Sequence, residues 1–189
     1  MKNLLCTTVL ILVASGLNAL EMDSSRSTLN ITSVKNDRLA ELFTFKKVSG
    51  TIDDASGKAS IEVALDSIDS GIEVRDERMR KYLFNTEEFS TASFTADVDL
   101  KALNSLKSGE QREVELKGEL VLNGYTVPLS FQTQVMRLNS GALSVATVAP
   151  GFIDVTRHKM APGIEKLRSL AGLDNISLAV PVTFSVVFK

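Results

Sequence analysis

The sequence has few of the residues that most metal sites and nucleophilic active sites use. It contains one cysteine, one histidine and no tryptophan among 189 residues. The cysteine, Cys6, lies in a segment that we expect to be removed, so the mature chain has no disulfide and no thiolate nucleophile or metal ligand. Stability must therefore come from an ordinary apolar core, and about 170 residues are enough for one such domain.

The sequence also lacks an excess of positive charge. Its 21 lysine and arginine residues stand against 23 aspartate and glutamate residues, which gives a formal net charge of −2. Proteins that bind nucleic acid rely on basic patches. We therefore expect no nucleic-acid partner.

Residues 1–19 have the pattern of a secretory signal peptide. Lys2 precedes a mostly apolar run from Leu4 to Leu17, and Ala19 ends a plausible cleavage site. The run is shorter than the ~20 apolar residues that a membrane-spanning helix needs. We expect a cleaved signal peptide over 1–19, one domain over 20–189, and a periplasmic or secreted location.

Alternation of apolar and polar residues is the strongest structural signal. It extends over residues 91–100, 113–122, 125–135 and 176–188, and this period of two is typical of half-buried strands. Asn123-Gly124 joins two of these runs and favours a type I′ hairpin turn, in which both central residues have positive φ. Further strands are predicted near 27–34, 39–48, 58–66 and 142–149. The short connections favour antiparallel pairing of about eight strands, as a barrel or a sandwich.

Two segments interrupt the alternation and are predicted to be short helices. Residues 162–171 begin with Pro162 and precede Gly172, which suits a helix start and a helix C-cap. The second, which we call the lid segment, is SIDSGIEVRDERMRKYLF, residues 67–84. Here Ser70 and Glu73 form a candidate capping box, and the acid–base pairs Asp76–Arg80 and Glu77–Lys81 are spaced for a helix. This pairing explains most of the charge in the lid segment.

The sequence offers little for catalysis. His158 is the single histidine, and no Gly-x-Ser-x-Gly elbow accompanies it. Its basic neighbours Arg157 and Lys159 disfavour a protonated imidazole. We interpret His158 as a surface or rim residue and expect no catalytic residue, no metal and no cofactor.

Several motifs together resemble the YceI-like family. The resemblance covers nearly all of residues 22–188, and the lid segment with its flanks is the specific part. The matching residues are Leu65-Asp66-Ser67-Ile68-Asp69-Ser70-Gly71, Arg75-Asp76, Met79-Arg80, Phe84, Glu88-Phe89 and Ser93-Phe94, with Val48-Ser49-Gly50-Thr51-Ile52 upstream and Leu122-Asn123-Gly124-Tyr125-Thr126-Val127-Pro128-Leu129 downstream.

The resemblance implies a mainly β fold, an eight-stranded antiparallel lipocalin-like barrel that binds a long polyisoprenoid or similar amphiphilic lipid. The lid segment would then cover one end of the barrel, with Met79, Tyr82 and Phe84 facing the lipid. For Arg75 and Arg78, local pairing is favoured over contact with an anionic head group. The predicted ligand-binding residues are Ile61, Val63, Leu65, Met79, Tyr82, Phe84, Phe94, Val98, Leu116, Leu120, Leu129, Phe131, Val180 and Phe184.

The alternation leaves open whether the barrel is hollow. Small residues (Ala92, Ala96, Gly118 and Thr133) sit among large ones on the apolar faces. They can either leave a tunnel or fit the taper of a filled core.

Two other functions compete with lipid binding. A small outer-membrane barrel would turn the same apolar faces outward, although such barrels carry aromatic girdles that this chain lacks. A secreted hydrolase would have to use His158 and is the least favoured. The predicted partners are an isoprenoid-type lipid, a membrane in transient contact and a second copy of the chain in a homodimer.

Overall fold

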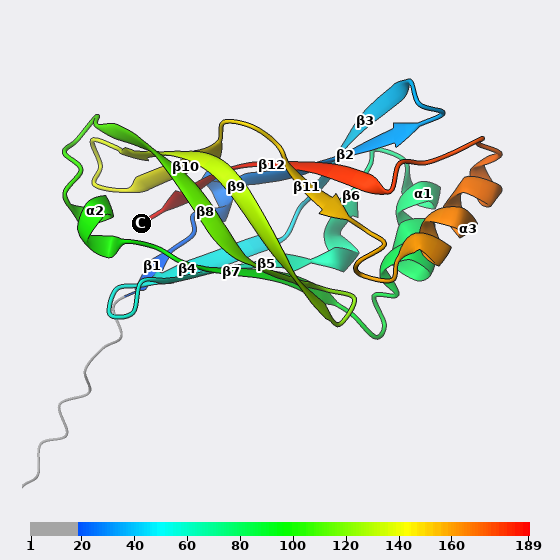
Figure 1. Ribbon diagram of the computed structural model, residues 1–189, viewed down its shortest axis with the longest axis horizontal. Coiled ribbons are helices and arrows are strands. Elements are labelled where there is room, and N and C mark those ends of the chain that lie inside the picture. Colours follow the sequence, from blue (N-terminus) through cyan, green and yellow to red (C-terminus); the bar gives the residue numbers. More distant parts are fainter. Residues whose placement is uncertain (1–18) are drawn as a thin grey trace, which may run out of the picture.

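A computed structural model describes residues 19–189, which form a curled antiparallel sheet with short helices at both ends (Figure 1). The strands are β1 (Ala19–Glu21), β2 (Thr28–Lys35), β3 (Leu39–Phe45), β4 (Val48–Asp53), β5 (Lys58–Ala64), β6 (Ile68–Asp69), β7 (Thr91–Asp97), β8 (Gln111–Leu122), β9 (Tyr125–Arg137), β10 (Leu143–Thr147), β11 (Gly151–Asp154) and β12 (Ala179–Phe188). The helical elements are η1 (Ser24–Arg26), η2 (Leu65–Ser67), α1 (Glu73–Arg78), η3 (Met79–Phe84), α2 (Leu100–Asn104) and α3 (Ala161–Ala171). The predicted signal peptide lies outside the described residues apart from Ala19.

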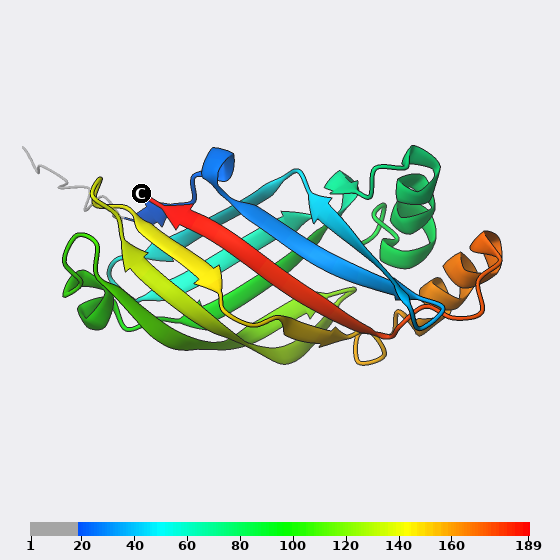
Figure 2. The same cartoon turned by 90° about the horizontal axis from the view of Figure 1, so that it is seen from above.

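The sheet curls back on itself. Its strand order is β1-β4-β5-β7-β8-β9-β10-β12-β2-β3-β6, with β11 paired to β12, and every pair is antiparallel. The edge strand β1 also reaches the end of β12, because Glu21 and Lys189 exchange two backbone hydrogen bonds of 2.9 Å. Figure 2 shows the resulting barrel-like shape from above, with β12 and β2 crossing over the interior. The predicted mainly β, lipocalin-like class is confirmed.

The structure has twelve strands where the sequence predicted about eight, because four short strands, β1, β4, β6 and β11, lie outside the predicted ranges or at the end of one. The predicted strand 39–48 ends as β3 at Phe45, and β4 begins after Lys46-Lys47, while β5 is separated from β6 by the single turn of η2. Residues 148–150 divide β10 from β11 in the same way. A curled sheet has to turn its strands at corners. At Lys46-Lys47 the inward-facing positions accordingly shift by one residue, from Phe43 and Phe45 to Val48 and Ile52. The three-residue β1 is too short for a period to be visible.

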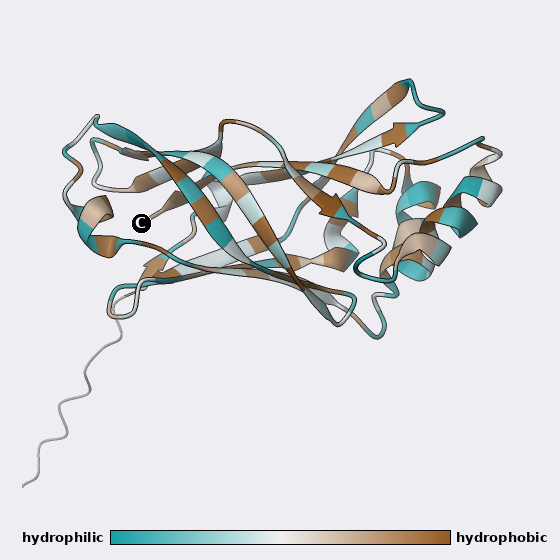
Figure 3. Cartoon of the chain, viewed as in Figure 1, coloured by the Kyte–Doolittle hydropathy of each residue, from teal (hydrophilic) through white to brown (hydrophobic). Residues whose placement is uncertain are grey.

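The β8–β9 hairpin forms as predicted. Asn123 and Gly124 have φ values of 52° and 75°, as a type I′ turn requires. On β8, Val114 and Leu116 face the interior, whereas Glu113 and its acidic and basic neighbours along the strand are exposed. Figure 3 shows this alternation of hydrophobic and hydrophilic residues along β8 and β9.

Helices cover the two ends of the barrel differently. We call the end covered by α1, η3 and α3 the lid end and the opposite end, where α2 lies, the α2 end (Figure 1). The prediction for α3 is confirmed, since Pro162 lies in its first turn and Gly172 ends it with a φ of 62°. Within residues 19–189, no helix is both long enough and apolar enough to cross a membrane.

The predicted capping box in the lid segment is wrong. Helix α1 begins at Glu73 behind Ile72, and no side chain caps it. The Ser70 hydroxyl instead accepts a hydrogen bond of 2.7 Å from Nε of Arg75, while the Ser70 N–H donates to Asp76 over 3.0 Å. Gly71, with a φ of 77°, turns the chain so that Ser70 cannot cap the helix axis.

The predicted acid–base pairs of the lid segment are also wrong. Asp76 is 3 % exposed and engaged with the Ser70 N–H, so it does not pair with Arg80. Arg80 pairs instead with Glu73 over 2.6 Å, and among residues 19–189 no ion pair joins Glu77 to Lys81. The reason is that α1 gives way to the wider π-helical turn η3 at Met79, which changes which side chains share a face.

Candidate ligand-binding cavity

The barrel encloses an elongated cavity of about 230 Å³. Its lining extends from Leu103 of α2 to Ile164 of α3, so the cavity runs between the two ends of the barrel. Of the 37 lining residues, 33 are apolar and the exceptions are Ser93, Asp99, Arg112 and Thr133. The sequence left open whether the barrel is hollow or filled, and the structure shows that it is hollow.

Thr133 presents no unpaired polar group to the cavity. Its side chain is among the most buried of the chain, at 1 % exposure, and its hydroxyl donates a hydrogen bond of 2.8 Å to the carbonyl of Val114. Because a buried hydroxyl with a partner costs little, the middle of the cavity behaves as an apolar surface.

Three phenylalanine rings pack edge to face along the cavity wall. The centroids of Phe94 and Phe131 are 5.5 Å apart, and those of Phe131 and Phe184 are 5.1 Å apart. Two glycines make room for these rings: a Cβ at Gly118 would lie 2.5 Å from the Phe94 ring, and one at Gly151 would lie 2.4 Å from the Phe131 ring. Because the two glycines have no side chains, the phenylalanine rings can lie close to the backbone.

Twelve of the fourteen predicted residues line the cavity. They are Ile61, Val63, Leu65, Phe84, Phe94, Val98, Leu116, Leu120, Leu129, Phe131, Val180 and Phe184. Their contact with a lipid stays a prediction. The two others do not line it: Met79 is 4 % exposed and packs in the core at the lid end, and Tyr82 is 38 % exposed on the outside, below the Lys166 ammonium.

Sequence reasoning missed lining residues that come from outside the predicted strands. Ala102 and Leu103 come from α2. Leu83 comes from η3, Ile164 comes from α3, and Met160 lies directly before α3. Helix α2 has five residues, too few to show a helical period. Arg112 could have been found, since it lies two residues before Val114 on the same face of β8.

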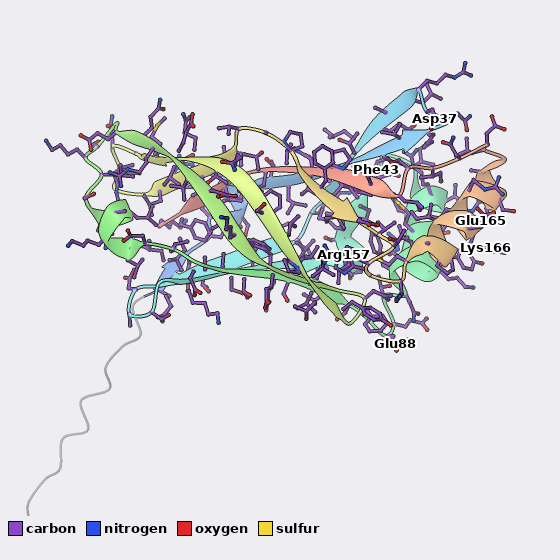
Figure 4. All side chains as sticks on the ribbon, in the orientation of Figure 1. Asp37, Phe43, Glu88, Arg157, Glu165 and Lys166 are labelled. Atoms are coloured by element: carbon purple, nitrogen blue, oxygen red, sulfur yellow. The ribbon has the colours of Figure 1, made fainter. Side chains whose placement is uncertain are left out.

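The lid segment is tied to β3 by Arg75. Its guanidinium donates to Glu41 over 2.7 Å and lies 4.6 Å from the centroid of the Phe43 ring. Figure 4 shows Phe43 between the strands and the lid helices. Hydrogen bonding from Lys35, together with the charge of Arg75, lowers the pKa of the Glu41 carboxyl. Arg75 is paired, as predicted, but its acidic partner lies on β3 and not within the lid segment, and Arg78 makes no ion pair within residues 19–189.

His158 is not a surface or rim residue. It is 1 % exposed, and its Nδ1 lies 3.2 Å from the carbonyl oxygen of Leu122. Asn123 donates a hydrogen bond of 2.9 Å to the His158 carbonyl. His158 therefore fixes the β8–β9 turn against the loop before α3. In the described part of the chain no hydroxyl or carboxylate hydrogen bonds to its ring, so the hydrolase alternative has no catalytic geometry. No cluster of three metal-ligating side chains occurs there either.

The apolar faces of the strands point inward, which contradicts the outer-membrane alternative. Along β8, Glu113, Glu115, Lys117 and Glu119 are all exposed on the outer face. Charged side chains on this face would have to lie in lipid, at a cost of ~2–4 kcal/mol for a lysine at the bilayer midplane.

The fold and the cavity define a lipocalin-like barrel with an apolar interior. The model of the YceI-like domain matches residues 20–188, so the chain belongs to the YceI-like family. No curated protein sequence matches the chain. A polyisoprenoid-binding domain from Saccharophagus degradans, implicated in plant cell wall breakdown, is 36% identical with a TM-score of 0.86, and the match covers 90% of this chain and 97% of that one.

A second solved structure shares the fold at lower identity. BcnA from Burkholderia cenocepacia is 17% identical with a TM-score of 0.67, and the match covers 89% of this chain and 99% of that one. At this identity the likeness concerns the fold alone.

Proposed function

We propose that this protein holds a long-chain polyisoprenoid or a similar amphiphilic lipid, such as a prenyl quinone or a prenyl phosphate, inside its barrel. The observation that carries the proposal is the apolar cavity running between the two ends of the barrel. The relative from Saccharophagus degradans, described as polyisoprenoid-binding, supports the class of ligand. In this proposal the protein is a binding protein and performs no catalytic step.

The apolar lining favours a long hydrocarbon chain as the ligand. Each methylene-sized group that leaves water contributes roughly 0.8 kcal/mol before the costs of ordering. A prenyl chain is made of such groups and needs no hydrogen bonds along its length. A prenyl chain therefore suits this cavity wall, in which the hydroxyl of Thr133 already has a hydrogen-bond partner.

We further propose that the protein is a periplasmic carrier or storage protein after removal of residues 1–19. A carrier has to receive and release its lipid, so we also predict transient contact with a membrane, and a homodimer as the assembly in solution. Leu42 and Phe152, which are 64% and 62% exposed, are large apolar side chains on the outer face of the sheet. Vesicle flotation tests the membrane contact, and analytical ultracentrifugation tests the dimer.

The lipid proposal is tested by filling the cavity. Ala59 lines the cavity on β5, whereas Ala40 is exposed on β3. We expect delipidated wild-type protein to bind a fluorescent prenyl lipid saturably and Ala59→Phe to lose most of this binding. The matched control Ala40→Phe should bind like the wild type. Overpacking by the new ring costs about 1–3 kcal/mol of stability, so thermal melts must show that both variants are folded.

Two outcomes contradict the proposal. One is an absence of saturable binding of prenyl lipids by the wild-type protein. The other is unchanged affinity in folded Ala59→Phe, which would place the lipid outside the cavity.

A further inference from the structure

The cavity carries all its charge at one end. Asp99 and Arg112 are the two charged residues among the 37 that line it. Asp99 precedes α2, and Arg112 is the second residue of β8, so both lie at the α2 end (Figure 1). At the lid end the lining residues Phe84, Met160 and Ile164 are apolar. An amphiphile in this cavity therefore meets charged groups at the α2 end alone.

Asp99 already has a structural role. Its carboxylate accepts a hydrogen bond of 3.0 Å from the Ala102 N–H and so caps α2. The nearby Arg137 is also occupied, because its guanidinium donates to the carbonyls of Leu103 and Gly141, over 2.8 Å each. These two groups hold the helix in place.

Arg112 has no such role. Among residues 19–189, its side chain makes no hydrogen bond and no ion pair. It pairs with Val135, which is 4% exposed, and lies on the same face of β8 as the cavity residues Val114 and Leu116. Arg112 itself is exposed and lines the cavity, so its guanidinium lies at the mouth, between the apolar interior and solvent, with all five N–H groups available.

We propose that Arg112 binds the phosphate head group of a prenyl lipid, whose tail extends toward the lid end. This inference rests on the proposed function. A guanidinium matches a phosphate with two parallel hydrogen bonds, which are stronger than bonds between neutral groups. The apolar lid end offers no comparable partner. Other cations at that end, such as Arg157 and Lys166 in Figure 4, do not line the cavity, whereas Arg112 does.

The experiment compares two ligands that share one tail: geranylgeranyl phosphate and geranylgeraniol. We expect Arg112→Gln to weaken binding of the phosphate roughly 10- to 100-fold and to leave binding of the alcohol unchanged. Lys117→Gln is the matched control, since Lys117 lies on the same strand but faces outward, with 75% of its side chain exposed. Lys166→Gln tests the opposite orientation.

The outcomes separate this inference from the proposed function. If the wild type binds both ligands and Arg112→Gln loses neither, the head-group site is wrong while lipid binding stands. Loss of phosphate affinity in Lys166→Gln but not in Arg112→Gln would reverse the orientation of the lipid and overturn the inference. If the wild type binds neither ligand, the proposed function itself fails.

Discussion

The two ends of the barrel are closed by different means. At the lid end, η3 and α3 bury large side chains against the sheet, among them Phe84 and Ile164, and Arg75 adds an ion pair to β3. At the α2 end, the five residues of α2 and the chain that follows contribute Leu103 and Leu106 to a smaller core.

The two ends therefore differ in their expected roles: the lid end contributes more to stability, and the α2 end is the expected entrance for the lipid. The lid end buries more apolar surface, which is the main stabilising contribution in folding, and its cavity lining is apolar. At the α2 end, one short helix is capped by the Asp99 carboxylate and held by Arg137 of β9, which donates a hydrogen bond to the Leu103 carbonyl. Elements with few buried contacts open at a lower free energy than the core. We therefore expect the α2 end to open more readily and to admit the lipid.

The largest expected effect comes from removing one apolar side chain at each end. Phe84 is 5% exposed with its ring 6.1 Å from that of Phe45, and Leu103 is 7% exposed. Phe84→Ala should lower the free energy of unfolding by about 3–5 kcal/mol and Leu103→Ala by about 2–3 kcal/mol, because a short helix can shift to fill the space. Urea denaturation measures both. An equal or greater loss in Leu103→Ala would contradict the unequal stability of the two ends.

A second prediction concerns the contact between α3 and η3. A Cβ at Gly163 would lie 2.5 Å from the Tyr82 carbonyl oxygen and 2.9 Å from Cα of Leu83. Gly163→Ala should therefore destabilise the protein by about 1–3 kcal/mol, although the same change inside a helix ordinarily stabilises by ~0.5–1 kcal/mol. Ser169→Ala, exposed on the same helix, is the control in the same denaturation experiment. A stabilised Gly163→Ala protein would show that the lid helices are not tightly packed.

The features that the sequence predicted correctly depend on local chemistry. Asn123-Gly124 specifies its turn because few other residues adopt positive φ twice in succession, and Pro162 with Gly172 marks both ends of α3. Alternation likewise placed Leu116 and Phe131 inside the barrel, because a strand must send every second side chain to the same face.

What the sequence did not predict depends on contacts between distant segments. His158 looked like a rim residue because its neighbours are basic, but it is buried against a carbonyl 36 residues away. Ser70 and Glu73 match the capping box in spacing, yet Arg75 takes the hydroxyl of Ser70. The bend at Lys46-Lys47 arises where the sheet turns a corner, and there the inward-facing positions shift by one residue, from Phe43 and Phe45 to Val48 and Ile52.

The smallest effect concerns the chain termini at the α2 end. Asp23 accepts hydrogen bonds of 2.6 Å and 3.1 Å from the hydroxyl and N–H of Ser25, and it pairs with Lys189 over 2.9 Å. The Ser25 hydroxyl, followed by Lys189, lowers the pKa of the Asp23 carboxyl from 3.8 to about 2. This carboxylate holds the start of the barrel to its last strand.

A carboxyl whose pKa is lower in the folded state stabilises the protein above its unfolded-state pKa. The contribution of Asp23 is therefore fully present above about pH 4 and is lost as the pH falls toward 2. Asp23→Asn should lower Tm by a few degrees at pH 7, and the difference from the wild type should shrink between pH 4 and pH 2. Lys189→Gln should have a smaller effect, because the Ser25 hydrogen bonds remain. Thermal melts across this range measure the difference, and a gap that stays constant down to pH 2 would show that the charge of Asp23 does not hold the α2 end together.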